Sequence, residues 1–167
     1  MKLIFETTPE QKLEVYKIAT LMQADPSLSP EFITNVVELA LKSEGAFNLM
    51  ELWRDDSSPE ERAEVVADLQ ELVDEHKDAV PGPVRKPKIS FENLEATIKD
   101  VKRFKKKLRD IVDQRGGINQ LAKLTGIPQP SLSRFFASAS MPRRTTLYKI
   151  AIALDLEEKD IVTDWAA

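Results

Sequence analysis

Apolar residues recur every three or four positions along most of the chain, which is the spacing of amphipathic helices. In the first 80 residues, Thr8, Ser29 and Ser58 each stand directly before a proline. Such a pair is typical of an N-cap followed by the first residue of a helix. We therefore expect helices to begin at these three points, with a further short helix over 46–53, so that residues 1–80 form a small helical bundle.

The apolar positions also predict the stripes along which these helices pack. The second helix is expected to end at about Leu41 and to be closed near Gly45. A short edge strand over Met1–Phe5 is the alternative at the N-terminus. The stripe of the first helix is formed by Leu13, Tyr16, Ile18 and Leu21, and that of the fourth by Val65, Val66, Leu69, Leu72 and Val73.

One helix, or two end to end, is predicted over residues 91–114. Phe91, Leu94, Ile98 and Val101 step by three, four and three residues, as in the a/d seam of a coiled coil. The extension over 91–101 either packs on the N-terminal bundle or pairs with a second subunit, and both alternatives stay open. The continuation is expected to pack inward through Phe104, Leu108, Ile111 and Val112.

Residues 119–138 have the spacing of two short helices joined by a tight turn. Gly126 stands at the turn, where glycine accepts a positive φ without steric cost. Pro128 follows where the second helix begins. Such a pair of helices suits the major groove of DNA. The apolar sides of the two helices are formed by Leu121, Ala122 and Leu124, and by Leu132, Phe135 and Phe136.

The polar face of the second helix carries side chains suited to reading bases. Gln and Arg make bidentate hydrogen bonds to adenine and guanine edges. Pro130 removes a backbone N–H that a first helical turn leaves unsatisfied anyway, so it contacts DNA only through its ring. For Ser131, a local hydrogen bond to the helix backbone is the alternative. The candidate base-reading residues are Gln129, Pro130, Ser131, Ser133 and Arg134.

The motifs Leu121-Ala122, Thr125–Pro128, Ser131–Arg134 and Thr146–Leu154 follow one another in this order. They resemble the Xre/Cro-type, or lambda-repressor-like, helix-turn-helix family. The resemblance implies a five-helix domain whose recognition helix is 128–137. It also implies a sequence-specific transcriptional regulator, a repressor that binds a two-fold operator in double-stranded DNA as a homodimer. The alternative is an antitoxin whose N-terminal domain holds a partner toxin while the helix-turn-helix regulates its own operon.

Phosphate contacts are expected from residues that flank the motif. Arg143 and Arg144 stand at the start of the last helix, where free N–H groups and the helix dipole attract an anion. Lys102, Arg103 and the three lysines at 105–107 are more typical of a solvated helix face with some long-range steering. The candidate phosphate-contacting residues are Asn119, Gln120, Arg143, Arg144 and Thr145.

The net charge of −4 conceals two oppositely charged halves. Residues 1–84 hold 7 Lys/Arg and 18 Asp/Glu, whereas residues 85–167 hold 17 and 10, so only the second half suits a polyanion. Pro81, Pro83 and Pro87 lie between them. We predict an acidic helical domain over 1–80 (for a partner, dimerisation or an effector), a Pro-rich linker over 81–90 and a helix-turn-helix DNA-binding domain over 91–167.

The composition argues against several other classes of protein. The chain has no cysteine and a single histidine, His76, on an acidic helix. We therefore expect no metal site, no cofactor and no catalytic activity. No apolar run is long enough to span a bilayer, and the apolar stretch at the N-terminus is too short for a secretory signal. We therefore expect a cytoplasmic protein without a membrane partner.

Overall fold

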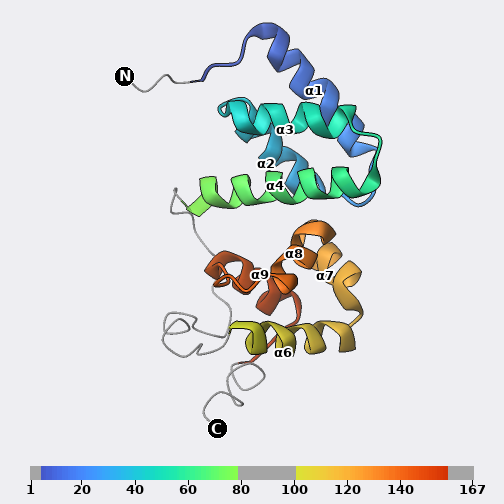
Figure 1. Ribbon diagram of the computed structural model, residues 1–167, viewed down its shortest axis with the longest axis vertical. Helices are drawn as coiled ribbons and strands as arrows, with labels where there is room; N and C mark the ends of the chain where they lie inside the picture. Colours follow the sequence, from blue (N-terminus) through green and yellow to red (C-terminus); the bar gives the residue numbers. More distant parts are fainter. Residues whose placement is uncertain (1–4, 79–100, 158–167) are drawn as a thin grey trace. The chain divides into compact units, whose positions relative to one another are not determined.

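The computed structural model describes residues 5–78 and 101–157, and these residues form helices without strands (Figure 1). The predicted all-α fold is confirmed. The chain divides into two compact units. The first holds α1–α4 together with residues 126–131, and the second holds α6, α7, α9 and most of α8. The helices are α1 (Pro9–Gln23), α2 (Pro30–Ala40), α3 (Glu44–Asp55), α4 (Pro59–Asp78), α6 (Val101–Gln114), α7 (Gly117–Thr125), α8 (Gln129–Ala137) and α9 (Arg144–Ala153).

Three predicted features lie outside the described residues. They are the edge strand at the N-terminus, the linker over 81–90 and the extension that precedes Val101. Four of the five helices implied for the C-terminal domain fall within the described residues.

Three helices of the first unit, α1, α2 and α4, begin at the predicted caps. The Thr8 hydroxyl accepts a hydrogen bond from the Gln11 N–H (3.2 Å), and the Gln11 side chain accepts one from the Thr8 N–H (2.8 Å). This is a capping box, in which two otherwise unpaired donors are satisfied reciprocally. The Ser29 and Ser58 hydroxyls accept hydrogen bonds from N–H groups in the first turns of α2 and α4.

The prediction that Gly45 closes the second helix is wrong. The Ser43 hydroxyl accepts a hydrogen bond from the Ala46 N–H, so α3 begins directly after α2 and contains Gly45 in its first turn. As a result α3 covers 44–55 and is longer than the predicted 46–53.

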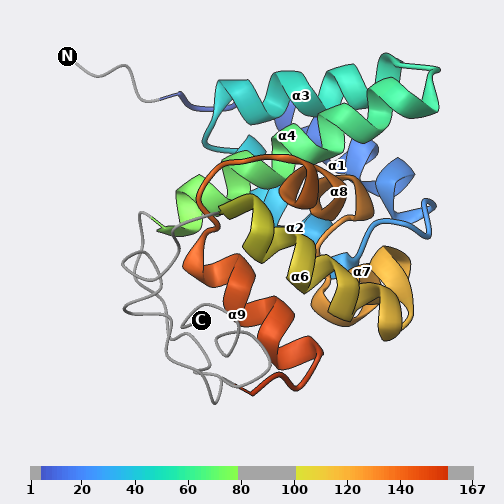
Figure 2. The ribbon, with the colours of Figure 1, turned by 60° about the horizontal axis from the view of Figure 1, so that its bottom comes forward.

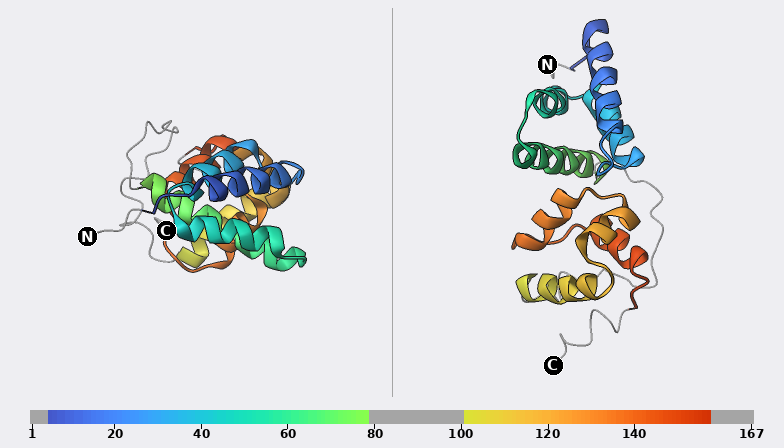
Figure 3. Two further views of the ribbon diagram at one scale, coloured as in Figure 1. Left: turned by 90° about the horizontal axis from the view of Figure 1, so that it is seen from above. Right: turned by 90° about the vertical axis from the view of Figure 1, so that its right-hand side faces the viewer.

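The core of the first unit lies between α3 and α4, which run side by side, and α2, which packs against both (Figures 1 and 3). The predicted stripe of α4 is confirmed, because four of its five residues are buried and Leu72 packs against the core while partly exposed. The large fully buried side chains include Phe32, Val36, Met50 and Leu69.

The predicted stripe of α1 is wrong. Leu13, Tyr16 and Leu21 are about half exposed, whereas Val15, Ile18 and Met22 are fully buried. The buried residues are spaced by three and four and therefore stay on one face of the helix. The predicted stripe advances by three, two and three residues, so its members spread around the helix and only Ile18 reaches the core.

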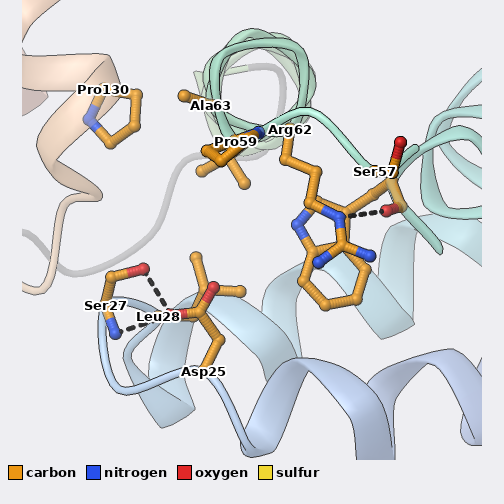
Figure 4. A pocket seen from close by; sticks show the side chains of 10 residues that line it. Asp25, Ser27, Leu28, Ser57, Pro59, Arg62, Ala63 and Pro130 are labelled. Carbon is orange, nitrogen blue, oxygen red and sulfur yellow. Dashed lines mark hydrogen bonds between the residues drawn. The ribbon is translucent and has the colours of Figure 1, made fainter.

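Two loops of the first unit are fixed by polar contacts (Figure 4). The Ser27 N–H and hydroxyl both donate to Asp25 Oδ1, at 2.9 and 2.6 Å, which closes a turn between α1 and α2. Arg62 Nε donates to the Trp53 carbonyl oxygen at 3.0 Å, and the guanidinium carbon lies 4.8 Å from the centroid of the Trp53 ring. These contacts of Arg62 join α4 to the end of α3.

In the second unit, α7 packs against both α6 and α9 (Figure 2). α6 supplies the buried residues Phe104, Leu108 and Val112, as predicted, and Ile111 is partly buried. α9 supplies Leu147 and Ile150.

Candidate nucleic-acid interface

A three-residue link joins α7 to α8. α7 ends at Thr125, whose hydroxyl donates to the Leu121 carbonyl oxygen at 2.8 Å, and Gly126 then adopts a φ of +74°. The left-handed conformation is costly for residues that carry a Cβ, so glycine suits this position. The Ser131 N–H donates to the Pro128 carbonyl oxygen at 3.0 Å within the first turn of α8. The arrangement is a helix, a tight turn and a second helix.

Apolar residues anchor both helices of the motif. Ile118 and Leu121 of α7 are buried, and Leu132 of α8 is fully buried. The prediction that Leu124 belongs to the apolar side of α7 is wrong, because its side chain is 52% exposed. The buried face follows Ile118, Leu121 and Thr125 at intervals of three and four, and Leu124 lies to one side of it.

The candidate base-reading residues all lie in the first two turns of α8. Helical geometry places Pro130 and Arg134 one turn apart, on the face opposite Leu132. Ser133 lies beside Arg134, and Gln129 and Ser131 belong to the first turn. Among the described residues, the Ser131 hydroxyl has no hydrogen-bond partner, so the alternative of a local bond to the helix backbone is not observed.

The candidate phosphate-contacting residues lie at the starts of two other helices. Asn119 and Gln120 are exposed in the first turn of α7. Arg143 is the N-cap of α9, with Arg144 and Thr145 in its first turn. The Arg143 side chain makes no capping hydrogen bond, so it supplies no acceptor to the first N–H groups of α9. This helix start therefore has the donors and the dipole that an anion requires.

Sequence reasoning missed a group of contacts between α6 and the end of α8. The Lys105 side chain is 2% exposed, and its ammonium donates to the carbonyl oxygen and the hydroxyl of Ser138, at 3.0 and 3.1 Å. Burial lowers the pKa of Lys105 below the usual lysine value. The prediction that Lys105 lies on a solvated face is therefore wrong. A lysine within a basic run has no feature in the sequence that separates it from its exposed neighbours.

The basic character of the second half holds within the described residues. Residues 101–157 contain 12 Lys/Arg and 4 Asp/Glu, whereas residues 5–78 contain 6 and 18. Lys102, Arg103 and Lys106 are exposed on α6, as predicted.

The described residues contain no group of three or more His, Asp or Glu residues that could hold a metal ion. Within 5–78 and 101–157, no helix has the length and apolarity to cross a bilayer.

A comparison with protein families matches residues 107–161 to the model HTH_3, described as helix-turn-helix. These residues include all of α7, α8 and α9. Residues 107–161 are thus similar to the Xre/lambda-repressor-like helix-turn-helix family, as far as the match extends. The resemblance predicted from the sequence is thus confirmed. Comparisons with curated proteins and with solved structures gave no match.

The helix-turn-helix domain over these residues supports a DNA-binding transcriptional regulator. The family match assigns the fold and the class of ligand. The roles of individual side chains on α7, α8 and α9 stay predictions.

The left-handed turn at Gly126 predicts the effect of a substitution there. We expect Gly126→Ala to lower the free energy of unfolding by about 1–2 kcal/mol, because the added Cβ disfavours a φ of +74°. The measurement is denaturant unfolding of the full chain, followed by circular dichroism.

Gly45→Ala is the control. A methyl group at Gly45 would meet only the Ser43 hydroxyl oxygen, at 3.8 Å, and this glycine is helical, so alanine should stabilise the protein by up to about 1 kcal/mol. Equal effects of the two substitutions would show that the turn does not depend on glycine.

Proposed function

We propose that this protein is a sequence-specific transcriptional regulator, a repressor that binds a two-fold operator as a homodimer. The observation that carries the proposal is the position of Arg134. It lies on the face of α8 opposite the buried Leu132, within a helix-turn-helix of a DNA-binding family. In this family's mode of binding, the early residues of the second helix enter the major groove. The excess of basic residues over 101–157 supports the approach of a polyanion.

The proposal divides the contacts into two kinds. Gln129, Pro130, Ser131, Ser133 and Arg134 would contact base edges from α8. Asn119, Gln120, Arg143, Arg144 and Thr145 would contact phosphates and fix the register of the protein on the duplex. We expect a homodimer, because one domain of this size reads only a short half-site and two copies are needed for a useful affinity for the operator. The protein would need no cofactor and would act in the cytoplasm, without catalysis.

Replacement of Arg134 tests the base-reading role. We expect Arg134→Ala to flatten the sequence preference at one base pair in each half-site, with a loss of discrimination of about 1–3 kcal/mol. The measurement is selection from random duplex DNA on the full-length variant, followed by sequencing of the bound pool.

Arg134→Lys is the matched control, because lysine keeps the charge and loses the planar fork that pairs with guanine. Both variants should lose the preference, and only the alanine variant should also reduce the slope of log K against log salt, by up to about one unit. An unchanged selected motif in both variants would refute the assignment of Arg134.

Replacement of Arg143 tests the phosphate-contacting role. Arg143→Ala should weaken binding to all duplexes by the same factor and reduce the slope of log K against log salt by about one unit, because one fewer counterion is released. The affinity is measured by fluorescence anisotropy at several salt concentrations. Lys42→Ala, in the acidic unit, removes the same charge and should leave the slope unchanged. An effect of Arg143→Ala confined to one base position would contradict the assignment.

A second candidate function is favoured by a specific observation on α1. Leu13, Tyr16 and Leu21 are 56%, 54% and 52% exposed, so three large apolar side chains of α1 are accessible to a partner. Residues 5–78 hold three times as many acidic as basic residues. Exposed apolar side chains on an acidic bundle suit a basic protein partner, as in an antitoxin that holds a toxin.

The antitoxin candidate predicts that the chain copurifies with a small basic protein encoded beside it. Leu13→Glu should abolish this copurification, because it would bury an unpaired charge in the interface with the partner. The affinity for DNA should stay unchanged. Lys12→Glu, at the neighbouring position, should retain the partner. If the wild-type chain purifies alone after coexpression with its neighbour, the simple repressor is the correct function.

A further inference from the structure

We propose that Lys105 and Arg109 of α6 are positioning residues that fix the orientation of the recognition helix α8, and thereby set sequence specificity without contacting DNA. The inference rests on the proposed function and adds a specificity-determining group outside the reading face. The observation behind it is that both cations are directed toward the end of α8 that follows the candidate base contacts.

Two adjacent aromatic rings on α8 form the target of these cations. Phe135 and Phe136 pack edge to face, with ring centroids 4.9 Å apart and an interplanar angle of 87°. The Lys105 Nζ atom lies 4.7 Å from the centroid of the Phe135 ring, and the Arg109 guanidinium carbon lies 5.6 Å from that of Phe136. Each distance is within the range of a cation–π interaction. Each ring is therefore paired with a different cation.

The two cations come from one stripe of α6. Lys105 and Arg109 are four residues apart, so they project from the same side of the helix. The Arg109 Nε donates to Asp113 Oδ1 at 2.9 Å, one turn further along, and this bond holds the guanidinium in its orientation. The pair of contacts thus links a fixed stripe of α6 to two successive positions of α8.

Lys105 also closes the C-terminal end of α8. Its ammonium donates to the carbonyl oxygen and hydroxyl of Ser138, the residue that directly follows α8. The Ser138 N–H in turn donates to the Arg134 carbonyl oxygen at 2.9 Å. A cation at this end of a helix satisfies unpaired carbonyl groups and opposes the helix dipole. Lys105 is therefore two hydrogen bonds away from the backbone of the candidate guanine reader.

Burial separates Lys105 from the lysines that steer DNA. Its side chain is 2% exposed, whereas Lys102 and Lys106 are exposed on the same helix. An amine that is enclosed and bonded to Ser138 cannot also reach a phosphate. The charge of Lys105 acts inside the domain, on the angle at which α8 presents Arg134. Because a bidentate contact with guanine depends on orientation, a small rotation of α8 would weaken specific binding more than non-specific binding.

The test uses the full chain and two duplexes, the sequence selected by the wild type and a scrambled version of it. Lys105→Met keeps the length and the apolar stem and removes the charge and the donors. We expect it to lower the affinity for the selected duplex by about tenfold, equivalent to ~1.4 kcal/mol, with the affinity for the scrambled duplex and the salt slope unchanged. Lys105→Arg keeps a cation and should recover most of the specific affinity. Lys106→Met is the control from the exposed face and should affect both duplexes alike.

Arg109→Met decides the question if Lys105→Met does not fold. The Arg109 side chain is 40% exposed, so its loss should leave the domain folded. Arg109→Met should also lower the affinity for the selected duplex and leave the affinity for the scrambled duplex unchanged. The proposal is overturned if both variants leave the ratio of the two affinities unchanged, or if they lower both affinities with a smaller salt slope, as a phosphate contact would. A wild-type chain that does not distinguish the two duplexes would instead refute the proposed function.

Discussion

Helix α8, the proposed recognition helix, has nine residues, and a helix of that length is not stable in water without tertiary contacts. Its position therefore depends on how it is attached to the rest of the domain. Leu132 is fully buried and Gly126 sets the direction of the chain between α7 and α8. The contacts of Lys105 with Ser138 and Phe135 hold the other end. Along the chain, each side chain proposed to read a base lies between Gly126 and Ser138.

The charge of the chain is organised by unit. Within the described residues, basic side chains outnumber acidic ones three to one over 101–157, and the ratio is reversed over 5–78. At physiological salt, interactions between exposed charges are largely screened beyond about 8 Å. The local charge of the helix-turn-helix domain is therefore a better guide to DNA binding than the net charge of −4.

The features that local chemistry determines were predictable from the sequence. Thr8, Ser29 and Ser58 were identified as caps because a cap and the proline after it lie within a few residues, and Gly126 was identified because few residues accept a positive φ. The helix-turn-helix itself was recognised from its spacing and is confirmed by the family match.

The features that depend on tertiary packing were not predictable in the same way. Leu124 is as apolar as Leu121, yet only Leu121 lies on the face that α7 turns inward. The roughly helical spacing of apolar residues predicts a stripe through Leu13 and Tyr16, although the buried face of α1 runs through Val15 and Ile18. Lys105 resembles its neighbours in sequence, and only the folded chain brings its amine to Ser138. The division of the interface into base and phosphate contacts stays a prediction, because it depends on the bound duplex.

The central claim is that this domain reads a DNA sequence. The most direct test is the affinity of the full chain for a duplex selected from a random pool and for a duplex of the same composition in scrambled order, over a range of salt concentrations. We predict that both affinities fall with salt while the selected duplex stays at least about a thousandfold tighter. Equal affinities for the two duplexes at every salt concentration would contradict the account.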